Sequence, residues 1–102
     1  MNPQYLSDGV QRTLKAIKAL AGQEANGLSP GQLAERLGTS PSNATRVLAN
    51  LQAAGFVEEH PRNPGRYRLG RALVSIANSV ELSLSAAAKA LAQDQQHYSR
   101  VI

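Results

Sequence analysis

Residues 29–51 read S-P-G-Q-L-A-E-R-L-G-T-S-P-S-N-A-T-R-V-L-A-N-L, and this stretch predicts two short helices joined by a tight turn. The first helix has a complete set of start signals: Ser29 at the N-cap, Pro30 at the first helical position and Gln32 at the third, which together form a capping box. Gly38 then ends the helix, because glycine adopts the left-handed backbone of a C-terminal cap without a steric penalty. The stretch therefore encodes its own helix boundaries.

The second helix begins after one intervening residue, with Ser40 as its cap and Pro41 at its first position. A connection this short makes the two helices cross steeply, as in a helix-turn-helix. The apolar residues at helical spacing form the predicted buried face: Ala44, Val47, Leu48 and Leu51. The opposite face carries short polar groups, one cation and no acid: Ser42, Asn43, Thr45, Arg46, Ala49 and Asn50. This face suits the major groove of DNA, although an ordinary helical hairpin with a solvated face has the same pattern.

After the second helix the periodicity changes to that of strands. Two short extended segments, 56–60 and 66–69, flank a turn at 61–65 that contains two prolines, an asparagine and a glycine, which predicts a β-hairpin. Arg66 and Arg68 alternate with apolar residues in the second segment. We therefore expect both arginines to point away from the core, where they would contact DNA phosphates or a minor groove.

The N-terminal segments are predicted to support this unit. Residues 1–7 predict a flexible arm, and Ser7 or Asp8 caps a helix. The apolar residues of that helix repeat at helical spacing: Val10, Leu14, Ile17, Leu20 and Ala21. The cations Arg12, Lys15 and Lys18 are placed on its outer face, where we interpret them as solvated rather than as phosphate contacts. Residues 8–70 are thus predicted to form a winged helix-turn-helix domain, mainly α-helical with a small β-hairpin.

Residues 71–98 form the longest helical pattern. Six residues recur at alternating spacings of four and three and define what we call the heptad face: Leu73, Ala77, Val80, Leu84, Ala87 and Leu91. Such a helix is longer than the small domain can cover, so we predict that the heptad face forms a homodimer. Weaker helix propensity around 79–85 leaves one helix and two helices as alternatives. Residues 99–102 are predicted to be a tail.

Composition excludes several classes of protein. The 102 residues suit one domain, and eleven Lys and Arg against seven Asp and Glu give a net charge of +4, which is compatible with nucleic acid. Because cysteine is absent, disulfides, thiolate metal sites and cysteine nucleophiles are excluded, which fits a cytoplasmic location. The two histidines, His60 and His97, lack neighbouring metal ligands, and no nucleophile pattern is present. We therefore expect no enzyme activity, no cofactor, no metal and no membrane association.

The chain resembles the DNA-binding domain of the IclR family of bacterial transcription regulators over about residues 10–73. The segments that carry the resemblance are V-Q-R-T-L-K-A-I-K-A-L at 10–20, L-A-E-R-L-G-T-S at 33–40, A-T-R-V-L-A-N-L-Q-A-A-G-F-V at 44–57 and G-R-Y-R-L-G at 65–70. The resemblance implies a winged helix-turn-helix that binds operator DNA as a dimer. Members of that family continue into an effector-binding domain, and we expect no such domain here.

The predicted DNA-binding residues lie on the second helix of the motif and on the hairpin: Ser40, Ser42, Asn43, Thr45, Arg46, Asn50, Arg62, Arg66 and Arg68. The family often has a basic residue where Pro41 stands and a histidine where Thr45 stands, so individual contacts are expected to differ. Our leading hypothesis is a sequence-specific regulator of transcription that binds double-stranded DNA as a homodimer. The alternatives are a winged-helix adaptor that binds another protein, and an accessory DNA-binding protein of phage or plasmid replication or transposition.

Overall fold

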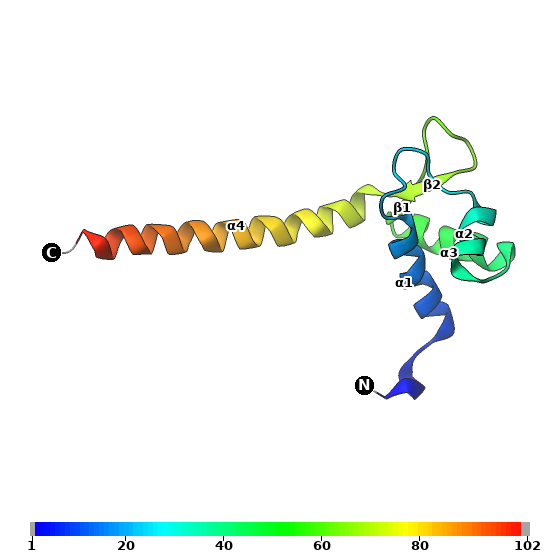
Figure 1. Cartoon of the computed structure of the whole chain (residues 1–102), viewed down its shortest axis with the longest axis horizontal. Helices are drawn as coiled ribbons and strands as arrows, with labels where there is room; N and C mark the ends of the chain where they lie inside the picture. The colour runs from blue at the N-terminus through cyan, green and yellow to red at the C-terminus, as the bar shows by residue number, and fades with distance from the viewer. Residues whose placement is uncertain (1, 101–102) are drawn as a thin grey trace.

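The computed structural model describes residues 2–100 and has the predicted fold, in which a helical domain with a two-stranded hairpin is followed by a long helix (Figure 1). The elements in chain order are the 3₁₀ turn η1 (Pro3–Tyr5), α1 (Asp8–Leu20), α2 (Pro30–Leu37), α3 (Pro41–Ala53), β1 (Val57–Glu59), β2 (Tyr67–Leu69) and α4 (Arg71–Ser99). Residues 101–102 of the predicted tail lie outside the described part of the chain.

The caps of the helix-turn-helix are confirmed. The Ser29 hydroxyl accepts a hydrogen bond from the Gln32 amide at 3.2 Å, and the Gln32 side chain accepts one from the Ser29 amide at 2.9 Å. Gly38 has a φ of 65°, and its amide donates to the carbonyls that end α2. At the start of α3 the Ser40 hydroxyl accepts from the Asn43 amide at 3.2 Å. These bonds satisfy groups that helix ends leave unpaired, so local sequence sets the boundaries of both helices.

The core lies between α1, α2, α3 and the base of the hairpin. Leu20 and Leu33 are its largest fully buried side chains, from α1 and α2. The rest of the core is formed by Ala16, Leu28, Ala34, Ala44, Val47, Leu48, Leu51 and Val57. The small Ala34 and Ala44 allow α2 and α3 to approach closely. All four residues predicted for the inner face of α3 are buried, which leaves its polar face outside.

The inner face of α1 differs from the one that the sequence predicts. Val10 and Leu14 are 55% and 47% exposed, whereas Ala16 and Leu20 are completely buried. The helix spacing is as expected, but the contact with α2 and α3 is made by the C-terminal half of α1. Its first turns extend beyond the core, so Val10 and Leu14 lie outside the core cluster.

The hairpin pairs β1 with β2 in antiparallel register, with Val57 opposite Leu69 and Glu59 opposite Tyr67. A third segment joins this pair, because Leu28 and Tyr67 exchange two backbone hydrogen bonds of 2.9 and 2.8 Å. Strands of three residues are only marginally stable as an isolated hairpin. The bridge at Leu28 therefore ties the hairpin to the loop between α1 and α2.

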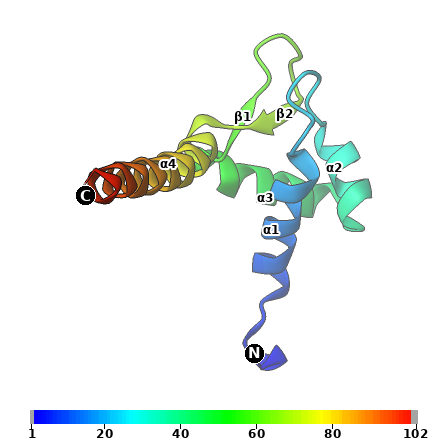
Figure 2. The same ribbon diagram turned by 60° about the vertical axis from the view of Figure 1, so that its left-hand side comes forward.

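The C-terminal segment is one continuous helix, which decides between the two alternatives left by the sequence. α4 runs for 29 residues without a buried residue and projects away from the domain, so that the molecule measures 69 × 42 × 20 Å (Figures 1 and 2). Val80, Leu84 and Leu91 of the heptad face are 57%, 63% and 60% exposed. Within residues 2–100, no helix is both long and apolar enough to cross a membrane.

The junction between the domain and α4 is tightly packed around Gly70, the N-cap of α4. The Gly70 amide donates to the Phe56 carbonyl at 2.8 Å, and the Ala72 amide donates to the Gly55 carbonyl at 3.3 Å. A Cβ on Gly70 would lie 2.5 Å from the Gly55 carbonyl oxygen and 3.2 Å from the Val57 amide nitrogen. Because both neighbours belong to the backbone, only glycine fits this position without a shift of the chain.

Gly70→Ala is expected to lower the free energy of unfolding by about 1–3 kcal/mol, because the added methyl group forces the two backbones apart. Urea denaturation followed by circular dichroism measures the change. Gly9→Ala is the matched control, since the nearest atom to its Cβ would be 3.9 Å away and alanine is favoured over glycine in a helix. A Gly70→Ala protein as stable as the unmodified chain would show that the junction opens at no cost.

Candidate nucleic-acid interface

The outer face of α3 presents the polar residues that the sequence predicts for DNA contact. Ser42, Thr45, Arg46 and Asn50 are exposed, while Asn43 is half-buried. Residues 41–53 contain no acidic side chain. The exposed face of α3 therefore carries short polar side chains on successive turns and a single guanidinium group. The other side of the helix is packed in the core.

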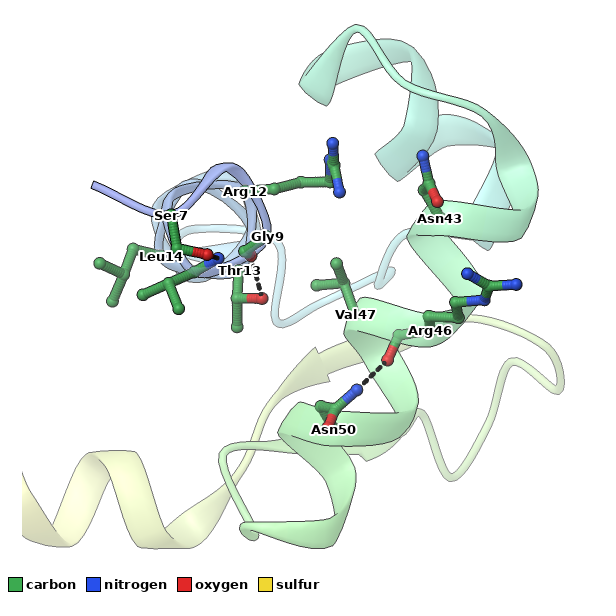
Figure 3. A pocket seen from close by; sticks show the side chains of 10 residues that line it. Ser7, Gly9, Arg12, Thr13, Leu14, Asn43, Arg46, Val47 and Asn50 are labelled. Atoms are coloured by element: carbon green, nitrogen blue, oxygen red, sulfur yellow. Dashed lines mark hydrogen bonds between the residues drawn. The ribbon is translucent and has the colours of Figure 1, made fainter. Parts of the chain in front are cut away.

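Several of these side chains already have hydrogen bonds within the domain. Asn43 donates from Nδ2 to the Thr39 hydroxyl at 2.9 Å, and Asn50 donates from Nδ2 to the Arg46 carbonyl at 2.8 Å. The Ser40 hydroxyl is used as the cap of α3. Arg46 has no ion pair among the described residues, and its side chain points away from α1 (Figure 3). Arg46 is thus the charged group of α3 that is free to meet an anion.

A groove of about 500 Å³ lies between the first turns of α1 and the outer side of α3. Arg12 extends across it from α1 toward Asn43, with Val47 at its base (Figure 3). Arg12 is half-buried, whereas its sequence pattern predicts a place on the solvated face of α1. The overlooked signal is its spacing, because Arg12 precedes the buried Ala16 by one helical turn and so lies on the side of α1 that faces α3.

Two arginines of the hairpin, Arg66 directly before β2 and Arg68 within it, do not point away from the core as the sequence predicts. Arg66 donates from Nε to the Asn26 carbonyl at 2.9 Å and from Nη2 to the Gly27 carbonyl at 3.1 Å. Arg68 lies 3.7 Å from the Glu58 carboxylate and 3.5 Å from the Glu24 carbonyl. The alternation was right for the strand, but the loop between α1 and α2 covers the face on which the arginines lie.

Three arginines of this region have neither an ion pair nor a side-chain hydrogen bond in the described part of the chain, whereas Arg66 is bonded to backbone carbonyls. The one ion pair found in residues 2–100 joins Arg68 to Glu58. Arg12, Arg46 and Arg62 therefore present unneutralised guanidinium groups, from α1, α3 and the hairpin turn respectively. Such groups form charge-assisted hydrogen bonds with phosphate oxygens. The hairpin contributes Arg62 rather than Arg66 or Arg68 to this set.

Neither histidine belongs to a metal-binding cluster within the described residues. His60 is 2% exposed, and its Nε2 lies 2.8 Å from the Ala25 carbonyl while Nδ1 accepts a hydrogen bond from the Arg62 amide at 3.1 Å. These two partners assign the proton to Nε2, because a carbonyl accepts and an amide donates. The ring of His60 is therefore part of the structure of the hairpin base.

Comparison with known proteins places this geometry in a family. The model of the MarR family matches residues 12–66, more than half of the chain. A glycerol operon regulatory protein of Streptomyces griseus is 41% identical over 70 residues, which cover 69% of this chain and 27% of that protein.

Two solved structures share both fold and sequence with the chain. An IclR transcriptional regulator from Alicyclobacillus acidocaldarius is 28% identical with a TM-score of 0.66, over 74% of this chain and 30% of that one. HmgR of Pseudomonas aeruginosa is 26% identical with a TM-score of 0.66, over 78% and 33%. The chain spans between 27% and 33% of the length of these three relatives. The resemblance to IclR regulators is thereby confirmed. The chain therefore belongs to the MarR family, as a winged helix-turn-helix DNA-binding domain of the kind found in transcriptional regulators, with IclR regulators among its structural relatives.

Proposed function

We propose that this chain is a sequence-specific regulator of transcription that binds double-stranded DNA as a homodimer. The observation that carries the proposal is the exposed, acid-free face of α3 with the unpaired Arg46 at its centre. A helix of this kind fits the major groove, where side chains reach the edges of bases. The glycerol operon regulator among the relatives supports promoter binding as the mode of action.

The residues around α3 are assigned separate roles. Arg46 bonds either a guanine edge or a phosphate, and Asn43 and Asn50, whose amides each keep a second N–H and an oxygen beside the bond made within the domain, are suited to adenine. Arg12 and Arg62 contact phosphates on the two sides of α3 and set its depth in the groove. The dimer is proposed because the heptad face of α4 is exposed from Ala77 to Leu91, and a dimer places two recognition helices on an operator with two-fold symmetry.

Arg46→Ala is expected to weaken binding to the preferred duplex by about 1–3 kcal/mol, because a guanidinium contact in the groove is lost. Fluorescence anisotropy with labelled duplex measures the affinity. Lys89→Ala removes the same charge from the outer side of α4 and serves as control, with affinity expected to stay unchanged. Equal affinity of Arg46→Ala and the unmodified protein would remove α3 from its assigned role.

Selection of duplexes from a random pool, combined with the solution mass of the protein, tests the proposal as a whole. An enriched inverted repeat bound by two copies is the expected result, with half-sites spaced by about one or two turns of DNA. A single enriched half-site bound by one copy would remove the dimer but keep sequence-specific recognition. No enrichment, together with no duplex binding at low salt, would overturn DNA binding and favour the protein-binding adaptor.

A further inference from the structure

The loop between α1 and α2 contacts the hairpin through four consecutive backbone carbonyl groups, those of residues 24–27. The Arg68 side chain lies 3.5 Å from the first carbonyl, and the His60 ring donates to the second at 2.8 Å. Asn63 donates to the Asn26 carbonyl at 3.1 Å, and Arg66 donates to the carbonyls of residues 26 and 27. Figures 1 and 2 show this loop and the hairpin turn side by side.

The close contact between loop and hairpin requires a glycine at position 27. Gly27 has a φ of +69°, and a Cβ there would lie 2.9 Å from the Tyr67 carbonyl oxygen and 3.2 Å from the Arg66 Cβ. The neighbouring Leu28 is 3% exposed and completes the backbone bridge to Tyr67. The loop is thus a fixed support for the hairpin, and we call residues 24–28 the wing support.

Three of the side chains that reach the wing support, those of His60, Asn63 and Arg66, lie close in sequence to Arg62, whose own side chain has no hydrogen bond or ion pair among the described residues. His60 joins the Ala25 carbonyl to the backbone amide of Arg62 through its two ring nitrogens. Asn63 follows Arg62 directly and is anchored on Asn26. The Arg66 amide closes the turn on the Asn63 carbonyl at 3.1 Å. The backbone on both sides of Arg62 is therefore held, while its side chain remains exposed.

Holding this backbone matters because the hairpin has little stability of its own. Two strands of three residues do not fix the seven residues that connect them, and a mobile turn loses conformational entropy when one of its side chains binds a phosphate. A turn that is already fixed avoids this loss. The wing support supplies that restraint through carbonyl groups of its backbone.

We propose that His60, Asn63 and Arg66 are positioning residues that hold the hairpin turn, so that Arg62 is the hairpin side chain that contacts a DNA phosphate. This inference rests on the proposed function. It assigns Arg66 to the support of the hairpin, although its charge and strand position suggested a DNA contact. Asn63, which carries no charge, is assigned the same role, and this equivalence makes the proposal testable.

The test measures the affinity for the selected duplex between about 50 and 200 mM salt, where the log–log slope falls by roughly 0.9 for each phosphate contact that is lost. The variants are Arg62→Ala, Asn63→Ala and Arg66→Ala, each of the last two also combined with Arg62→Ala, and Lys89→Ala as the control. Arg62→Ala is expected to reduce the slope by about 0.9. Asn63→Ala and Arg66→Ala are expected to reduce it in the otherwise unmodified protein and to cause no further reduction when Arg62 is already alanine.

Two outcomes of the salt titration would overturn the proposal. If Arg66→Ala lowers the slope by a further 0.9 or so in the Arg62→Ala protein, Arg66 is itself a phosphate contact. If Asn63→Ala leaves the slope unchanged, the turn does not need its anchor. A general loss of folded protein would not produce this pattern. It would not make the effect of Asn63→Ala or Arg66→Ala depend on whether Arg62 is present, and it would not change the log–log slope alone.

A second measurement keeps this inference distinct from the proposed function. Heteronuclear ¹⁵N relaxation of the free protein reports the mobility of residues 61–65 without DNA. Asn63→Ala and Arg66→Ala are expected to make this turn more mobile, whereas Arg62→Ala and Lys89→Ala are not. If Asn63→Ala and Arg66→Ala leave the mobility of residues 61–65 unchanged, the positioning role is overturned even if the protein binds DNA. If the unmodified protein binds no duplex, the proposed function and the Arg62 contact both fail, whatever the mobility of the turn.

Discussion

Leu84→Asp is expected to convert the proposed homodimer into monomers while the winged helix-turn-helix stays folded. Leu84 lies in the middle of the heptad face and is 63% exposed in the single chain. Burial of a leucine contributes roughly 1.5–3 kcal/mol, and the change removes one leucine from each copy and places two carboxylates in an apolar contact. The dimer is therefore expected to weaken by at least about 3 kcal/mol, or more than 100-fold in its dissociation constant. Sedimentation equilibrium measures this constant.

Leu82→Asp is the matched control for the dimer. Leu82 is the same residue type on the same helix, is 70% exposed and lies off the heptad face. We expect this variant to remain dimeric and to bind an inverted repeat as the unmodified protein does. Loss of the dimer in both variants would point to a general effect of charge on α4, and a Leu84→Asp protein that stays dimeric would remove the heptad face as the interface.

Leu33→Ala is expected to lower the free energy of unfolding by about 2–5 kcal/mol. Leu33 of α2 is completely buried in the core. Truncation of its side chain therefore removes apolar contacts and leaves a cavity that the surrounding helices fill only in part. Such a loss is a large share of the stability of a domain of this size. Urea denaturation with an unchanged m-value provides the measurement.

Leu82→Ala is the control for Leu33→Ala. Because Leu82 is exposed on a projecting helix, its truncation is expected to change the free energy of unfolding by no more than about 0.5 kcal/mol. A Leu33→Ala protein that unfolds at the same urea concentration as the Leu82→Ala protein would contradict the assigned core. The comparison also separates the domain from α4, since a change in α2 is expected to leave the dissociation constant of the dimer unaltered.

The helix-turn-helix was predictable because its boundaries depend on neighbouring residues. The Ser29 capping box, the left-handed Gly38 and the Ser40 cap each involve groups within three or four positions of one another, and each is found as expected. The inner face of α3 was predictable for a similar reason, since its apolar residues repeat without interruption. The proposed recognition residues on its outer face stay predictions, because no DNA contact has been measured.

Other features depend on partners that are distant in the sequence. Periodicity showed that Val10 and Leu14 share a face, but which turns of α1 reach the core depends on where α2 and α3 lie. The inward position of Arg66 depends on carbonyls 39 and 40 residues away, and Arg12 approaches the groove because of the crossing of α1 and α3. Alternation along one strand carries no information on a loop that covers it.

The backbone bonds at Gly70 have a mechanical consequence. Because the amides of Gly70 and Ala72 are bonded to the carbonyls directly after α3, we expect α4 and α3 to turn together about this junction, with α4 as the lever arm. With 29 residues at 1.5 Å each, the lever arm is roughly 44 Å long, so a displacement of about 3 Å at its far end turns the pivot by about 4°. In the proposed complex, whatever fixes the far end of α4 would thereby set the tilt of α3 in the groove of DNA.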